Sequence, residues 1–154
     1  MLFRSNDTAT TEIYTSVHTL SLHDALPITE ASVSAEPSVS CVLTTTATGD
    51  SPQPPTASLV QHLIGADRAA AFDINVVCAG FVFALSLANS LIATKPDAIV
   101  LIVAADVYSR ILDFGDRRTA ILFGDGAGAA VIGAVPAPYG LVDVELVTRG
   151  DGVS

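Results

Sequence analysis

The chain has 154 residues, an apolar content of 50% and a formal net charge of −9 at pH 7. Its seven lysines and arginines are scattered, so the sequence predicts none of the clustered basic surface that nucleic-acid binding requires. The two cysteines, Cys41 and Cys78, are too few for a disulfide framework and lack metal-ligand spacing, so we expect no metal site.

The first 28 residues do not follow the pattern of a folded domain. Read as codons, residues 6–14 and 19–28 match the translation of a widely used sequencing-library adapter, the second stretch in a shifted frame. A targeting peptide fits poorly, because acidic residues interrupt the segment and it has neither a basic nor an apolar region. We therefore predict that residues 1–28 are a non-native segment outside the fold and that residues 29–154 form a partial domain.

The remaining residues alternate between apolar runs and turn segments rich in glycine and proline. Continuous apolar strands alternating with helices predict a layered α/β domain. The helices are too short and too polar for a membrane span. In chain order the sequence predicts a strand (38–46), a helix ending near Gly65 (56–64), a strand of the buried type (69–75), a core helix (79–93), a buried, central, parallel strand (98–105), a charged loop (106–119) and two strands (128–135 and 141–147).

Cys78 stands where the strand at 69–75 leads into the helix at 79–93. Unpaired N–H groups and the helix dipole stabilise a thiolate at a helix start, and a thiolate is the nucleophilic form of cysteine. The alternative is a buried structural cysteine, because free cysteines are among the most buried residues. Cys41 lies within a strand, where no helix start favours its thiolate, and we do not expect it to react.

Four short runs carry a resemblance to a known family. They are Cys78-Ala79-Gly80-Phe81, Ala105-Asp106-Val107, Asp116-Arg117 and Phe123-Gly124-Asp125-Gly126-Ala127-Gly128-Ala129-Ala130-Val131. At this mutual spacing they resemble 3-oxoacyl-[acyl-carrier-protein] synthase III, a condensing enzyme of the thiolase superfamily. The resemblance runs from about residue 38 to the end. It implies a thiolase-like α/β fold, a duplicated unit of which this chain would hold most of the N-terminal half.

The resemblance implies acyl transfer from acyl-coenzyme A to Cys78, followed by decarboxylative Claisen condensation with a malonyl group on an acyl carrier protein. The pathway would be fatty acid or polyketide biosynthesis. Acyl-coenzyme A would be a substrate, with no cofactor. The protein would be a cytoplasmic homodimer without membrane or nucleic-acid partners, and the strand at 69–75 could pair across the two-fold axis.

The resemblance also assigns roles to individual side chains. Phe123 would lie near the nucleophile, with the following glycines letting the chain pass close to it. Tyr108 would line the acyl tunnel, where the family commonly has a smaller aliphatic residue. Arg117 would contact the nucleotide of coenzyme A, with a solvated loop arginine as the alternative. The backbone N–H of Cys78 would donate to the oxyanion, and burial of the helix at 79–93 between layers would shield the thiolate from water.

The family's catalytic His and Asn have no place in this sequence. All three histidines, His18, His23 and His62, precede Cys78. We therefore expect a chain that does not condense by itself and whose full-length parent is the enzyme. Two alternatives stay open: a synthase III-like acyltransferase of secondary metabolism, and an inactive truncated fragment.

Overall fold

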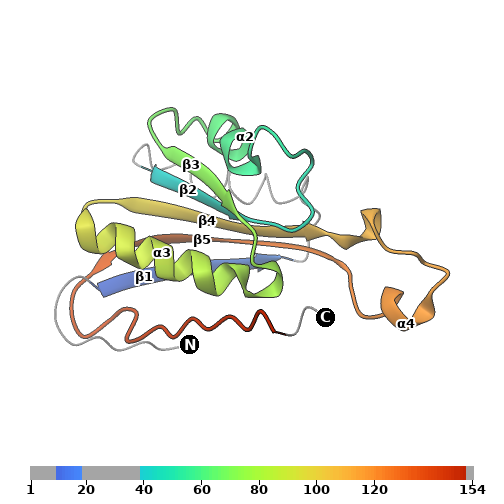
Figure 1. The fold of residues 1–154 in the computed structure, drawn as a ribbon. Coiled ribbons are helices and arrows are strands. Elements are labelled where there is room, and N and C mark those ends of the chain that lie inside the picture. The colour runs from blue at the N-terminus through green and yellow to red at the C-terminus, as the bar shows by residue number, and fades with distance from the viewer. Residues whose placement is uncertain (1–9, 19–38, 152–154) are drawn as a thin grey trace.

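A five-stranded mixed sheet organises the residues that this computed structural model describes, 10–18 and 39–151 (Figure 1). The strand order is β1-β5-β4-β2-β3. β2 runs parallel to β3 and β4, whereas β5 is antiparallel to β4 and β1. The strands are β1 (Thr10–His18), β2 (Val39–Thr45), β3 (Ala70–Ile74), β4 (Ile99–Val107) and β5 (Asp125–Val135).

Helices α2 (Thr56–Leu63) and α3 (Gly80–Thr94) contribute to two different packed clusters on this sheet. Both helices were predicted from the sequence and are confirmed. Short 3₁₀ turns lie at Val77–Ala79 and Tyr108–Arg110, and a one-turn helix α4 at Arg117–Ala120. Figure 1 shows α4 standing off the body of the protein, at the end of the excursion that joins β4 to β5.

The central strand β4 is buried on both faces. Val100 and Ile102 pack in the α3 cluster, and Leu101 and Val103 pack in the α2 cluster. All four side chains are at most 2% exposed. A strand covered on both faces needs a continuous apolar run. The burial of these four side chains confirms the prediction of a buried central strand. It is parallel to β2 as expected, but its other neighbour, β5, is antiparallel.

Helix α2 is fixed at both ends by residues outside it. The two carboxylate oxygens of Asp73, on β3, accept hydrogen bonds from the backbone N–H groups of Thr56 and Ala57, each at 2.7 Å. These donors belong to the first turn of the helix, where no intrahelical acceptor exists. Gly65, just beyond the other end, has a φ of 69°, which confirms its place at the C-terminal end.

The structure corrects two of the predicted strands. β3 is not of the buried type: it lies at the edge of the described sheet, and Phe72 is 40% exposed. Residues 141–147 form no strand. Their apolar pattern suits a strand, but they have no pairing partner in the described parts of the chain. β5 begins three residues earlier than predicted, because its first residue, Asp125, already pairs with Val107.

A strand also forms where the sequence predicted no contribution to the fold. β1 pairs with β5 in a continuous register from Thr10↔Val135 to His18↔Ala127. Residues 1–9 and 19–28 lie outside the described residues. The sheet thus includes residues 10–18 as β1, and the non-native origin of 1–28 and its lack of contribution to stability stay predictions.

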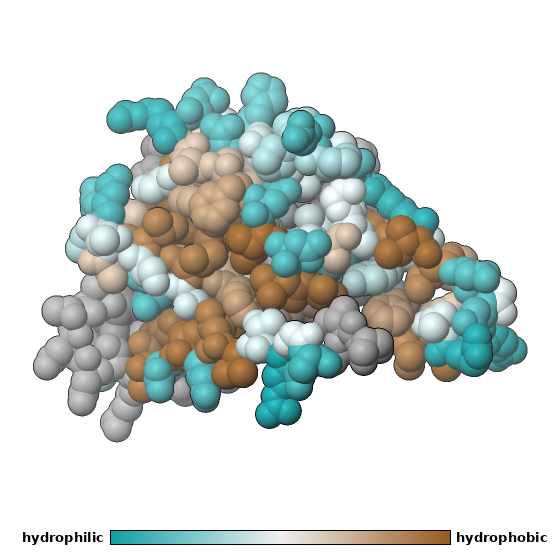
Figure 2. Space-filling model, viewed as in Figure 1, coloured by the Kyte–Doolittle hydropathy of each residue, from teal (hydrophilic) through white to brown (hydrophobic). Residues whose placement is uncertain are grey.

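Helix α3 covers the sheet with one face and exposes the other. With the preceding turn it forms an apolar stretch, Val77–Thr94, of a length and composition that could cross a membrane. Ala84, Leu85, Ala88 and Ile92 are nevertheless buried in the core. On the remaining surface Val82 is 51% exposed, and Figure 2 shows apolar side chains gathered over this helix. The expected burial of α3 on both sides is therefore wrong for the described residues.

Candidate active site around Cys78

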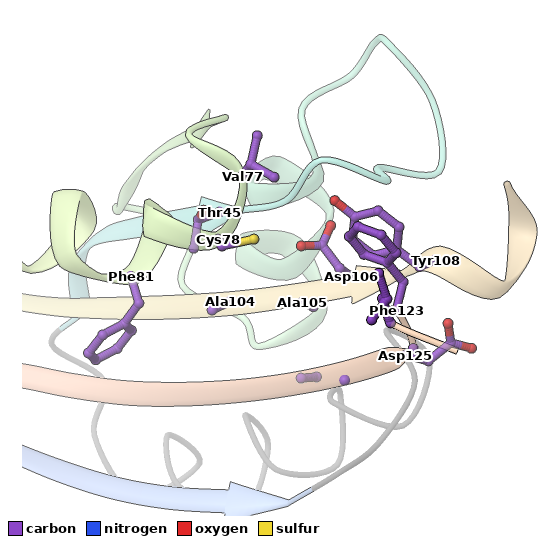
Figure 3. Close-up of a pocket in the computed structure, with 14 residues that line it drawn as sticks. Thr45, Val77, Cys78, Phe81, Ala104, Ala105, Asp106, Tyr108, Phe123 and Asp125 are labelled. Atoms are coloured by element: carbon purple, nitrogen blue, oxygen red, sulfur yellow. The ribbon is translucent and has the colours of Figure 1, made fainter. Parts of the chain in front are cut away.

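A pocket of about 490 Å³ opens at the edge of the sheet where β2 and β4 end and β5 begins. The start of α3 closes one side and the base of the β4–β5 excursion closes the other (Figure 3). Three of the four predicted site residues line it together: Cys78, Tyr108 and Phe123. Ligands of parallel α/β sheets commonly bind at the carboxyl ends of strands, so the location suits a binding site.

Cys78 occupies the 3₁₀ turn that immediately precedes α3. The predicted position at a helix start is confirmed. Its side chain is exposed, and in Figure 3 the sulfur points into the pocket. This exposure contradicts both the buried structural alternative and the expected shielding from water. Cys41 is the opposite case, because it is buried and burial raises the pKa of its thiol.

The residue before Cys78 has a strained backbone. Val77 has a φ of 47°, in the left-handed region that β-branched residues avoid. Such a conformation costs on the order of 1–3 kcal/mol and is found mainly at functional sites. The Asn75 side chain supports the turn by accepting a hydrogen bond from the Val77 N–H at 3.3 Å. The N–H of Cys78 has no acceptor among the described residues, so it is available to an oxyanion.

Gly80 sets how closely α3 approaches the sheet. A Cβ atom at this position would lie 1.7 Å from Oγ1 of Thr45, the last residue of β2. The sequence predicted close backbone passage at the glycines that follow Phe123. The structure assigns it to Gly80 instead, since no atom lies within 4 Å of a Cβ built at Gly124 or Gly126.

The opposite wall is an aromatic pair. The rings of Tyr108 and Phe123 stack with their centroids 5.0 Å apart and their planes at 26°. Below the pair, Asp125 accepts hydrogen bonds from the Ser109 backbone N–H at 2.8 Å and from its hydroxyl at 2.6 Å. These bonds, with the charge of Arg110, hold the pKa of Asp125 below its usual range. The bonds join Ser109, just after β4, to Asp125 at the start of β5, and so hold together the two segments at the base of the excursion.

Arg117 is not brought to the pocket. It is the first residue of α4, exposed and outside the pocket lining. Asp116 caps this short helix by accepting from the Arg118 N–H at 3.0 Å, and the Arg118 guanidinium binds the same carboxylate at 2.9 Å. These bonds lower the pKa of Asp116. Arg118, rather than Arg117, is therefore held in place by the local structure.

Asp106 is the pocket residue whose role the sequence did not reveal. Its Oδ1 accepts hydrogen bonds from Thr46 Oγ1 at 3.2 Å, the Ala47 N–H at 2.7 Å and Thr48 Oγ1 at 2.9 Å. These partners lie about 60 residues earlier in the chain, and no local pattern signals such contacts. The run Ala105-Asp106-Val107 marked the position only through the family resemblance. Within residues 10–18 and 39–151, no cluster of His, Cys, Asp or Glu side chains is arranged to hold a metal ion.

Comparisons with known proteins agree with this geometry. A family model described as 3-oxoacyl-[acyl-carrier-protein (ACP)] synthase III matches residues 72–150. A beta-ketoacyl-[acyl-carrier-protein] synthase III from Deinococcus deserti is 47% identical over 116 residues, covering 75% of this chain and 33% of the relative. An acetoacetyl CoA synthase from Streptomyces sp. strain CL190 is 57% identical over 89 residues, covering 57% of this chain and 26% of the relative.

The fold comparison gives the same result. A crystal structure of beta-ketoacyl-[acyl carrier protein] synthase III from Thermus thermophilus matches with a TM-score of 0.68 and 29% identity, covering 88% of this chain and 53% of that one. The thiolase-like α/β fold expected from the sequence is therefore confirmed. The chain spans about a third of the length of the Deinococcus relative.

Proposed function

Because the chain belongs to the 3-oxoacyl-[acyl-carrier-protein] synthase III family, we propose that its parent protein is a condensing acyltransferase with Cys78 as the nucleophile. The observation that carries this proposal is the exposed Cys78 thiol at the start of α3, directed into a pocket of about 490 Å³. The reaction would be acyl transfer from acyl-coenzyme A followed by condensation with a malonyl group on an acyl carrier protein.

The acyl-transfer step needs only groups that line the pocket. The Cys78 thiolate attacks the thioester carbonyl, a new carbon–sulfur bond forms, and coenzyme A leaves as a thiolate that takes up the proton Cys78 has lost. The free N–H of Cys78 donates to the oxygen that becomes negative in the transition state. In the second step the malonyl group loses CO₂, its carbanion attacks the acyl carbonyl, and the Cys78 thiolate is released.

The acyl group would lie between Cys78 and the aromatic wall. The Tyr108 ring stacked on Phe123 takes up space there that a smaller aliphatic residue would leave open. We expect short acyl groups for this reason. Arg117 would serve coenzyme A as a phosphate or adenine contact at a distance from the reacting atoms, since its exposed guanidinium lies outside the pocket lining.

Further parts of the proposal concern the whole protein. We expect a cytoplasmic homodimer with no bound cofactor, whose partners are acyl-coenzyme A and an acyl carrier protein. The edge position of β3 supports a dimer in which this strand pairs with its copy. Sedimentation of the full-length parent should give twice the monomer mass, and a stable, active monomer would contradict the dimer.

One alternative acceptor is favoured by a specific observation. The Streptomyces relative, at 57% identity, is named an acetoacetyl CoA synthase, so the malonyl group could be carried by coenzyme A instead of a carrier protein. The test compares malonyl-carrier protein with malonyl-coenzyme A in the 154-residue chain and in a chain extended to the length of its relatives. We expect product from the extended chain alone, and faster with the carrier protein. Equal or faster turnover with malonyl-coenzyme A supports the alternative, and no turnover with either refutes the proposal.

A further inference from the structure

Asp106 joins the two strand ends that carry the opposite walls of the pocket. It is the penultimate residue of β4 and lines the pocket. Its three hydrogen-bond donors, Thr46 Oγ1, the Ala47 N–H and Thr48 Oγ1, all follow directly on β2. The Thr48 hydroxyl closes a ring, because it donates to Asp106 and accepts from the Val107 N–H at 2.7 Å. The strand ends are therefore locked together by a charged acceptor and four hydrogen bonds.

Each end of this lock continues directly into a pocket wall. On the β2 side, Thr45 contacts the start of α3 at Gly80, two residues after Cys78, and leaves no room for a Cβ there. On the β4 side, Val107 leads into Tyr108, whose ring stacks on Phe123. The network thus lies on a path of covalent and packed contacts that connects Cys78 with the aromatic wall.

The network is also charged and mostly shielded. Thr46 and Thr48 are each 8% exposed, and Asp106 is half-buried. The hydrogen bonds described for Asp106 all end on Oδ1, and Figure 3 shows its carboxylate directed toward the sulfur of Cys78. An acceptor that binds several donors of another segment holds the two segments in a fixed arrangement.

We propose that Asp106 is a positioning residue for acyl transfer, which holds Cys78 and the Tyr108–Phe123 pair at a fixed separation through its bonds to Thr46, Ala47 and Thr48. The proposal rests on the proposed function, because it concerns the geometry of that reaction. Asp106 itself forms no bond with the acyl group and transfers no proton. Its effect is on the fit of a substrate between the walls, and it leaves access of small reagents to the thiol unchanged.

The test uses the full 154-residue chain and compares two substitutions at one position. Asp106→Ala removes the acceptor, whereas Asp106→Asn keeps an oxygen in place of Oδ1. Acetylation of Cys78 by acetyl-coenzyme A is followed by intact mass, and alkylation by iodoacetamide is measured in parallel. A misplacement of about 1 Å costs on the order of 100-fold, so Asp106→Ala should slow acetylation by roughly 10- to 100-fold. Its alkylation should not slow in parallel, because iodoacetamide needs no fit between the walls, and Asp106→Asn should acetylate at nearly the wild-type rate.

Asp73→Ala is the matched control. It likewise removes a carboxylate that accepts hydrogen bonds from another segment, but the donors are two backbone N–H groups at the start of α2, and Asp73 does not line the pocket. Slowing of acetylation by Asp73→Ala to the same degree would reduce Asp106 to a general structural role. An Asp106→Asn variant as slow as Asp106→Ala would also overturn the proposal, since the acceptor geometry is kept.

Two further measurements keep the outcome decisive. If Asp106→Ala does not fold, Thr48→Val replaces it as the test, because it removes both hydrogen bonds of the Thr48 hydroxyl. Thr48→Val should also slow acetylation. An unchanged rate would count against a positioning role. If the wild-type chain is alkylated but not acetylated, the acyl-transfer step of the proposed function fails for this chain. Amide hydrogen exchange then decides the positioning alone: protection of the Ala47 and Val107 N–H groups should be lost in Asp106→Ala and kept in Asp106→Asn, and protection kept in both refutes it.

Discussion

Substituting Gly80 by alanine places a methyl group into the contact between α3 and β2. The new Cβ would lie 1.7 Å from Oγ1, 2.8 Å from Cβ and 3.2 Å from Cγ2 of Thr45. Rotation of the Thr45 side chain relieves the first contact but not the second, so the helix start must move away from the sheet. Overpacking of this kind costs typically about 1–3 kcal/mol. In a helix without this contact, alanine would instead be favoured over glycine by up to about 1 kcal/mol.

The balance predicts a net loss of about 1–2 kcal/mol in the free energy of unfolding. For a chain of this length that corresponds to a fall in Tm of roughly 2–8 °C. Differential scanning calorimetry measures it directly. Acetylation of Cys78 should slow as well, because the cysteine is two residues from the displaced helix start.

Two control variants isolate the contact. Gly124→Ala introduces the same methyl group at the pocket edge, where nothing lies within 4 Å, and should change stability by less than about 0.5 kcal/mol. Thr45→Gly removes the atoms that clash. The free energy of unfolding lost in the double variant Gly80→Ala/Thr45→Gly should therefore be about 0.5–3 kcal/mol smaller than the sum of the losses in the two single variants. A Gly80→Ala protein as stable as wild type, or more stable, would refute the reasoning.

Three further results are expected. Tyr108→Leu should raise the rate of acylation by hexanoyl-coenzyme A relative to acetyl-coenzyme A, and an unchanged ratio would count against the aromatic wall as a limit on acyl length. The hydrogen bonds from Ser109 depress the pKa of Asp125, so its stabilisation is complete above the unfolded-state pKa of about 3.9 and is lost as pH falls through the lower folded value. Asp125→Asn should therefore flatten the fall of Tm between about pH 5 and pH 2, and a fall as steep as in wild type contradicts this. Deleting residues 1–28 should leave Tm unchanged within error, because the sequence of this segment predicts a non-native origin. A drop of several degrees would show that the pairing of β1 with β5 stabilises the fold.

The elements that could be predicted from the sequence are those whose local residue pattern reflects how they are buried. β4 reads as one apolar run because α2 and α3 cover its two faces. The α3 helix and the place of Cys78 at its start could be predicted because a strand-like apolar run ends just before Cys78 and a helix-like apolar run begins just after it. Tyr108 and Phe123 were named through the family resemblance, and the structure places both beside Cys78 in the pocket.

The features that were missed depend on partners distant in sequence. The burial of β3 cannot be read from 69–75, because an edge strand and an inner strand can have the same composition. The apolar run at 141–147 lacks a pairing partner among the described residues. The Asp106 network and the contact of Gly80 with Thr45 join residues tens of positions apart. The positive φ of Val77 has no signal in the residue type, because β-branched residues avoid this region.

The central claim is that Cys78 accepts the acyl group, and one measurement tests it directly. The chain is incubated with acetyl-coenzyme A, digested, and its two cysteine peptides are compared by mass spectrometry. We expect a gain of one acetyl group on the Cys78 peptide, its loss in Cys78→Ala, and full labelling in Cys41→Ala, since Cys41 is buried and burial raises its pKa. An acetyl group on Cys41, or undiminished labelling of Cys78→Ala, would contradict the assignment.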